Sequence, residues 1–181
     1  MPSNKANGFS TIWKSGWVTH SARTAVAAVG SFTVAGLFRM PESYWAAVST
    51  IIVTQSTLGA AWDASRTRFV GTALGAALGG LLASCPKPRI IVFVAGIFAL
   101  GLICAMLRLD QSAYRFAGIT LAIVTLVPRS QAPFVIALHR FVEVSIGIAF
   151  ALALSALWPE REPARVTPLP ATPRGPAAKA P

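Results

Sequence analysis

The chain has 181 residues, of which 54% are hydrophobic and only 12% are charged, and its mean hydropathy is +0.61. A typical soluble domain is about 25% charged, so this composition excludes an ordinary soluble fold and predicts an integral membrane protein with the lipid bilayer as a partner. The formal net charge of +10 does not indicate nucleic-acid binding, because the cations lie mostly between apolar segments and in the two tails. Cys85 and Cys104 offer neither a disulfide framework nor a metal site of zinc type.

Apolar segments separated by short polar breaks predict an all-α protein. Residues 1–20 are polar to amphipathic, with Phe9, Trp13 and Trp17 four residues apart, and are expected to form a cytoplasmic, interfacial segment. Residues 21–158 are expected to form a domain of six transmembrane helices. The six apolar segments cover residues 22–38, 44–61, 69–84, 90–107, 113–127 and 139–158. Most have 16–20 residues, against the roughly 20 that a bilayer core requires.

Proline and charge define the predicted ends of these segments. Pro41 follows the first segment, a charged turn at residues 63–68 follows the second, and Pro128 follows the fifth. Pro159 ends the sixth, and residues 159–181 are rich in Pro, Ala and Arg without periodicity. This last stretch is predicted to be a disordered cytoplasmic tail.

The distribution of cations predicts that both termini lie in the cytoplasm. With the N-terminus inside, eleven cations lie on the inner side and five on the outer side. The inner ones are Lys5, Lys14, Arg23, Arg66, Arg68, Arg108, Arg115, Arg161, Arg165, Arg174 and Lys179, and the outer ones are Arg39, Lys87, Arg89, Arg129 and Arg140.

The two halves of the sequence resemble each other at an offset of 72 residues. Residues 68–70 and 140–142 are both Arg-Phe-Val, and Gly75 corresponds to Gly147. The second and fifth segments also align weakly, at an offset of 71. Because each half has three segments, an odd number, the halves would have opposite orientations. We therefore predict two inverted three-helix repeats, a common plan of secondary transporters.

Glycines at a spacing of four predict close helix packing. The third segment carries Gly71, Gly75 and Gly79, and Gly147 lies on the matching face of the sixth. Small residues at this spacing allow helix backbones to approach each other. Glycines that line a pore are the alternative interpretation.

The second and fifth segments are polar and are candidates for a binding site. Thr54 and Gln55 belong to the second, and Thr125 belongs to the fifth, which is the shortest. Short or interrupted segments at matching positions of two halves indicate a substrate site. The alternative is that these hydroxyl groups bond to their own helices.

Glu143 is the acidic residue inside a predicted span, where carboxylates are costly and usually functional. His139 and Arg140 precede it on the same helical face. Glu143 is therefore a candidate for proton coupling, and a structural ion pair with Arg140 is the alternative. The sequence has no catalytic motif, metal-ligand set or phosphate-binding loop, so no enzyme activity, catalytic residue, metal or cofactor is expected.

Four motifs in this order and spacing resemble the fusaric acid resistance (FUSC) family, also called the aromatic acid exporter superfamily. They are Arg23-Thr24-Ala25, Pro41-x-x-Tyr44-Trp45-Ala46, Arg68-x-x-Gly71-Thr72-x-x-Gly75 and Arg140-Phe141-x-Glu143-x-x-x-Gly147. The resemblance covers about residues 19–158. It implies a six-span bundle in the bacterial inner membrane that exports small, often aromatic, carboxylic acids with the proton gradient.

Larger members of the family often join two bundles, so this one is expected to form a homo-oligomer, a dimer. An organic-anion channel is the second interpretation. A non-transporting membrane protein that acts in a complex or in envelope maintenance is the third.

Two arginines are expected to bind a substrate that carries a carboxylate. Arg68 would begin the third segment at the cytoplasmic side and Arg140 the sixth at the outer side, so each would lie near one mouth of the bundle. Guanidinium binds carboxylate through two parallel hydrogen bonds. The substrate would compete with Glu143 for Arg140, and protonation of Glu143 would release Arg140 to the substrate.

Overall fold

The computed structural model describes residues 17–55, 57–128 and 130–158, and within them the secondary structure is entirely helical. The helices are α2 (Trp17–Leu37), α3 (Tyr44–Val53), α4 (Leu58–Ala83), α5 (Arg89–Met106), α6 (Gln111–Leu126) and α7 (Pro133–Leu157). The all-α prediction is confirmed. Most of the predicted interfacial segment and the whole predicted tail lie outside the described residues.

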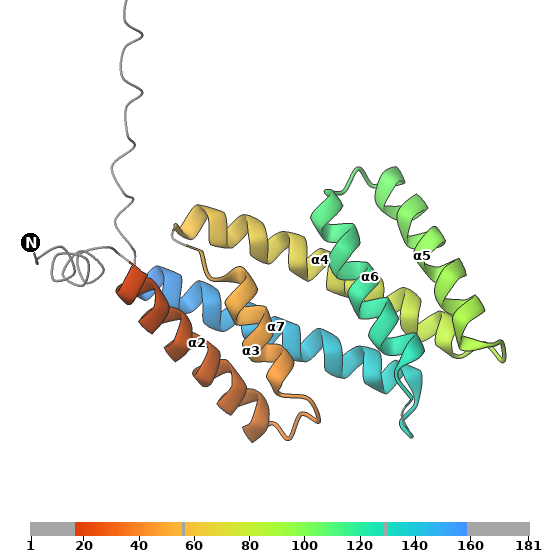
Figure 1. Ribbon diagram of the computed structural model, residues 1–181, viewed down its shortest axis with the longest axis horizontal. Helices are drawn as coiled ribbons and strands as arrows, with labels where there is room; N and C mark the ends of the chain where they lie inside the picture. The colour runs from red at the N-terminus through yellow and green to blue at the C-terminus, as the bar shows by residue number, and fades with distance from the viewer. Residues whose placement is uncertain (1–16, 56, 129, 159–181) are drawn as a thin grey trace, which may run out of the picture.

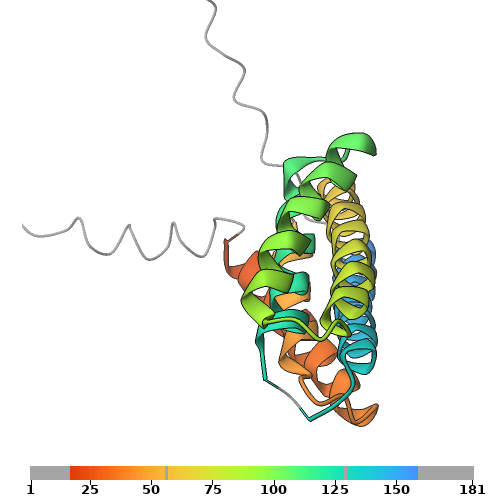
Figure 2. The ribbon, with the colours of Figure 1, turned by 90° about the vertical axis from the view of Figure 1, so that its right-hand side faces the viewer.

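The helices form two layers, and one layer consists of an antiparallel pair of long helices. α4 and α7 run side by side along the molecule, with α2 and α3 over one end and α5 and α6 over the other (Figure 1). The view turned by 90° shows α4 and α7 in one layer and the other helices in the second (Figure 2). α2 packs on α3 and α7, whereas α5 packs on α6 and α4. α3 and α6 make no contact with each other over the described residues.

α2 and α5 end in the same way. Arg39 and Arg108, which follow them, have positive φ angles of 53° and 52°. The next amide in each case, of Met40 and of Leu109, bonds the carbonyl five residues earlier. This is a Schellman ending, which leaves an arginine in the left-handed conformation that glycine usually adopts there.

Three predicted boundaries differ from the structure. The predicted segment 44–61 is divided between α3, which ends at Val53, and α4, which begins at Leu58. The Thr57 side chain accepts a hydrogen bond from the amide of Ala60 and caps α4. The predicted charged turn at 63–68 is wrong, because these residues lie inside α4. α7 begins at Pro133, six residues before the predicted start, since proline is favoured in the first turn of a helix.

The described residues expose large apolar side chains and bury polar ones. On α5 the side chains of Ile90, Val94, Phe98 and Leu102 are all more than half exposed. The buried polar and charged residues are Arg23, Ser31, Ser49, Thr50, Thr54, Ser65, Arg68, Thr72, Thr120, Thr125, Arg140, Glu143 and Ser155. A contiguous apolar exterior is rare on soluble monomers and is typical of surfaces that meet lipid or a partner.

Helix lengths distinguish α5 and α7 from the rest. Among the described residues these are the two helices that are long and apolar enough to cross a membrane, by length and composition. α3 has 10 residues, or about 15 Å at 1.5 Å per residue, and covers half of a hydrocarbon core of about 30 Å. α6 has 16 residues. The second helix of each half is thus the shortest of its half.

Candidate functional site

Glycines bring α4 against α6, and α7 against α3, at backbone contact. A Cβ atom added to Gly75 would lie 2.3 Å from the carbonyl oxygen of Ala117, and one added to Gly147 would lie 2.3 Å from that of Ala46. A Cβ atom does not approach a non-bonded oxygen this closely, so both crossings require glycine. The glycines predicted to pack helices all lie against a neighbouring helix: Gly71, Gly75, Gly79 and Gly147.

Arg140 lies in a buried cluster with two carboxylates. Its Nη1 is 3.4 Å from Oε2 of Glu143, and its Nη2 pairs with Glu42. Its guanidinium lies over the Trp45 ring, 4.2 Å from the centroid. Glu143 also accepts a hydrogen bond of 3.1 Å from the amide of Glu42. Glu143 therefore ties the loop between α2 and α3 to α7, and the structure brings together the two residues proposed for substrate and proton.

Arg68 has a similar environment without the carboxylates. Its Nη2 donates to Oγ of Ser49, 3.0 Å away, and its guanidinium lies over the Phe116 ring, 4.7 Å from the centroid. The residue is only 5% exposed. Within the described residues no carboxylate lies within ion-pair distance of it. Its Nε and the Oγ of Ser65 are buried and have no hydrogen-bond partner there.

Both arginines lie inside helices and not at the predicted helix starts. Arg68 is the eleventh residue of α4, and Arg140 is the eighth of α7. The prediction that each begins a segment at a mouth of the bundle is therefore wrong. The helices extend toward their N-termini beyond the purely apolar stretches, because exposed polar residues such as Asp63 and Arg66 occupy the outer face of α4.

The predicted polar residues of the second and fifth segments lie at the ends of α3 and α6. Thr54 and Thr125 donate their hydroxyl protons to the carbonyls of Thr50 and Leu121, at 2.7 and 2.8 Å. Gln55 donates to its own helix as well, to the carbonyl of Ile52. Within the described part of the chain none of these three side chains hydrogen-bonds to Arg68 or Arg140. The structure therefore does not join them to the arginines.

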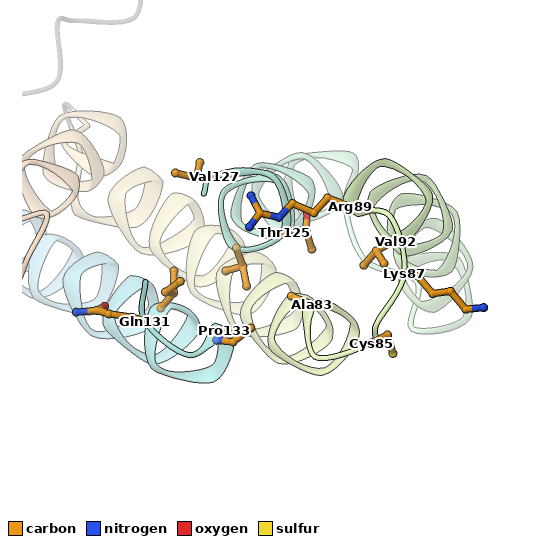
Figure 3. A pocket seen from close by; sticks show the side chains of 11 residues that line it. Ala83, Cys85, Lys87, Arg89, Val92, Thr125, Val127, Gln131 and Pro133 are labelled. Atoms are coloured by element: carbon orange, nitrogen blue, oxygen red, sulfur yellow. The ribbon is translucent and has the colours of Figure 1, made fainter. Parts of the chain in front are cut away.

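Thr125 lines a pocket of about 80 Å³ between the ends of α4, α5, α6 and α7 (Figure 3). Arg89, Lys87 and Gln131 also line it, and its described lining contains no acidic residue. In the view of Figure 3 the Arg89 side chain extends over the end of α6, and Lys87 points away from the pocket. The pocket thus combines apolar walls with a cation near its opening.

At the C-terminal ends of α3 and α7 an arginine joins the two helices. Arg23 of α2 is 1% exposed, and it donates to the carbonyls of Gln55 and Trp158. These are orphan carbonyls at helix C-termini, where a cation is favoured. Gln55 thus contributes its backbone at this site.

Sequence reasoning assigned no role to four residues around the two arginines: Glu42, Ser49, Ser65 and Phe116. Trp45 and Phe116 are related by the offset of 71 that relates the second and fifth segments. That offset differs by one from the offset of the third and sixth segments, so one alignment of the halves does not reveal the matching aromatic partners.

Comparison with known proteins gives the family. The family model described as fusaric acid resistance protein-like matches residues 25–154. The inner membrane protein YeeA of Escherichia coli is 30% identical over 151 residues, which cover 80% of this chain and 42% of that protein. The inner membrane protein YccS of the same organism is 22% identical over 174 residues, or 88% of this chain and 24% of that protein.

The chain thus spans less than half the length of these curated relatives. No solved structure matches it significantly. Because the family model covers most of the described helical bundle, the chain belongs to the fusaric acid resistance protein-like family.

Proposed function

We propose that this chain is an inner-membrane transporter that exports small aromatic or other organic acids and couples their movement to protons. The observation that carries the proposal is the matched packing of two three-helix units, α2–α3–α4 and α5–α6–α7, around buried arginines. The family assignment and the inner membrane relatives support a role in membrane transport. No enzyme activity is part of the proposal.

The matched contacts support an arrangement as inverted repeats. The first helix of each unit packs on the second helix of its own unit and on the third helix of the other. Gly75 meets Ala117 as Gly147 meets Ala46. Because three spans per unit are odd, such units have opposite orientations in a membrane. Substrate sites of transporters built this way lie near the midplane, at the interface of the repeats.

The proposed cycle uses the two arginines and one carboxylate. Arg68 and Arg140 attract the substrate carboxylate, and Thr54, Gln55 and Thr125 line its path at the ends of the short helices. Glu143 takes up a proton and releases Arg140 to the substrate. Loss of that proton restores the Arg140–Glu143 pair and expels the substrate.

Flux measurements test the function and separate an exporter from an anion channel. In proteoliposomes with an imposed pH gradient, we expect uptake of radiolabelled benzoate well above that of protein-free liposomes. A protonophore should reduce this uptake to the protein-free level, because movement of the acid is coupled to movement of protons. Uptake that persists after the gradient collapses would favour a channel. No protein-dependent flux of any organic acid would favour a non-transporting role in a complex.

The native cysteines test the proposed topology, in which both termini are cytoplasmic. Cys85 is exposed in the loop between α4 and α5, whereas Cys104 is buried. An impermeant maleimide added outside intact spheroplasts should therefore label Cys85, and Cys85→Ser should remove the label. Labelling of Cys85 only after the membrane is permeabilised would reverse the orientation.

We also propose that the bundle works as a homodimer. The apolar exterior of α5 offers a surface for lipid or for a second copy.

A further inference from the structure

We propose that Arg68, with Ser65 and Ser49, is the binding site for the carboxylate of a small organic anion. The proposal rests on the proposed transport function, because it names the group that holds the transported acid. Binding and flux are separate measurements, so the binding site and the transport function can be contradicted independently.

Two buried donors without partners point to a missing acceptor. Arg68 and Ser65 are 5% and 4% exposed, and they lie three residues apart on α4, on neighbouring parts of one face. Over the described residues the Nε of Arg68 and the Oγ of Ser65 have no hydrogen-bond partner. Buried polar groups in native proteins are nearly always hydrogen-bonded. Since both groups can donate a proton, the ligand that satisfies them is an acceptor.

The Arg140 cluster shows how this chain stabilises the matching arginine. There Glu143 and Glu42 supply carboxylates. The residue that corresponds to Glu143 is Gly71, at the offset of 72, and the residue that corresponds to Glu42 is Ala113, at the offset of 71. The Arg68 site therefore has the arginine and lacks both acids.

The packing excludes an acidic side chain at the matching position. A Cβ at Gly71 would lie 2.4 Å from the carbonyl oxygen of Ala113. No acid can therefore replace Gly71 without moving α6 away from α4. Among the described residues no side chain supplies a carboxylate to Arg68, and we infer that a ligand does.

One edge of the Arg68 guanidinium carries N–H donors in the arrangement that a carboxylate binds. Phe116 covers one face of the group, which leaves the in-plane N–H donors for the ligand. Nε and Nη2 lie on the same edge of the planar group, and Nη2 already donates to Ser49. A carboxylate can accept from both N–H groups of this edge in parallel, which Lys cannot reproduce. α3 supplies Ser49 and α6 supplies Phe116, so the site lies where α4 meets these two helices.

Benzoate binding to the purified full chain in detergent tests the site, measured by calorimetry and by the shift of the melting temperature. We expect Arg68→Lys to weaken benzoate binding at least tenfold, because lysine cannot make the two parallel hydrogen bonds of a guanidinium. Ser65→Ala should weaken it about threefold. Arg66→Lys is the matched control, because Arg66 is an exposed neighbour on the same helix, and its affinity should stay within twofold of the wild type. Benzyl alcohol, the neutral analogue, should bind at least tenfold more weakly than benzoate.

Three results would overturn the site: equal affinity of Arg68→Lys and the wild type, equal affinity for benzoate and benzyl alcohol, or no benzoate binding by a chain that transports benzoate. The last result would leave the transport function standing. Conversely, benzoate binding that depends on Arg68 in a protein without flux would contradict the transport function and retain the site. If Arg68→Lys does not fold, Ser65→Ala decides, and unchanged affinity in that variant contradicts the proposal.

Discussion

Gly75→Ala and Gly147→Ala are each expected to prevent accumulation of the folded bundle. The added methyl group would lie 2.3 Å from a backbone carbonyl oxygen, of Ala117 or of Ala46. A backbone cannot rotate away as a side chain can, so the helices must separate. Overpacking of this kind costs about 3 kcal/mol or more, which is a large part of the 5–15 kcal/mol that stabilises a typical protein. We expect little monodisperse protein in detergent and a melting temperature lowered by well over 5 °C in any that remains.

Gly59→Ala provides the control on the same helix. Gly59 lies in the first turn of α4, and a Cβ there would meet nothing within 4 Å. Alanine is favoured over glycine in helices by up to about 1 kcal/mol, so this variant should match or exceed the wild type in stability. Normal yield and melting temperature for both Gly75→Ala and Gly147→Ala would show that the helices do not cross at this distance.

Hydropathy and proline predicted the approximate positions of the six helices in the described residues because both act locally. Each predicted apolar segment contains most of one helix, and the breaks near Pro41, Pro86 and Pro128 agree with the structure. The break between α3 and α4 was misplaced because it contains no proline or glycine. There Thr54 adopts an extended conformation and Thr57 caps the next helix. The charges at residues 63–68 predict a turn, but in α4 Asp63 and Arg66 are exposed and Arg68 is buried.

The sequence predicted the charged residues of the candidate site, but not the residues that contact them. Arg140 and Glu143 are three residues apart on one helix, so the sequence alone indicates their proximity. The contribution of Glu42 depends on a loop that folds back onto α7, and its separation of 98 residues from Arg140 gives no local signal. The stacking of Arg68 on Phe116 likewise depends on how α4 crosses α6, which glycine spacing permits but does not specify.

The comparison of the two arginines suggests different roles for them. Arg140 is held by side chains of the protein, whereas the carboxylate positions around Arg68 are occupied by Gly71 and Ala113. Arg68 is therefore suited to bind a substrate, and Arg140 to respond to a proton on Glu143. In the proposed transport cycle, a pair of similar sites that differ in this way would give one position to the substrate and one to the proton.

Glu143→Gln is expected to abolish pH-dependent flux while the bundle remains folded. Glutamine keeps an oxygen that can accept the hydrogen bond from the amide of Glu42, and Arg140 keeps its pair with the Glu42 carboxylate. The variant therefore loses the titratable group and little of the packing. Benzoate uptake in proteoliposomes should fall at least tenfold and become independent of the pH gradient, with a melting temperature within a few degrees of the wild type.

Arg140→Gln should behave differently, because it removes the cation that pairs with Glu42 and Glu143 in a buried site. Removal of one partner from a buried ion pair costs about 3–5 kcal/mol, so this variant should lose stability as well as flux. Adding Glu143→Gln to it should recover part of the lost stability, since one buried negative charge is then removed. Asp63→Asn, which changes an exposed acid on α4, is the control for loss of negative charge and should leave both quantities unchanged. Well-folded Glu143→Gln protein with normal pH-coupled flux would exclude Glu143 as the proton-coupling group, and a large loss of stability in that variant would assign it to the structure instead.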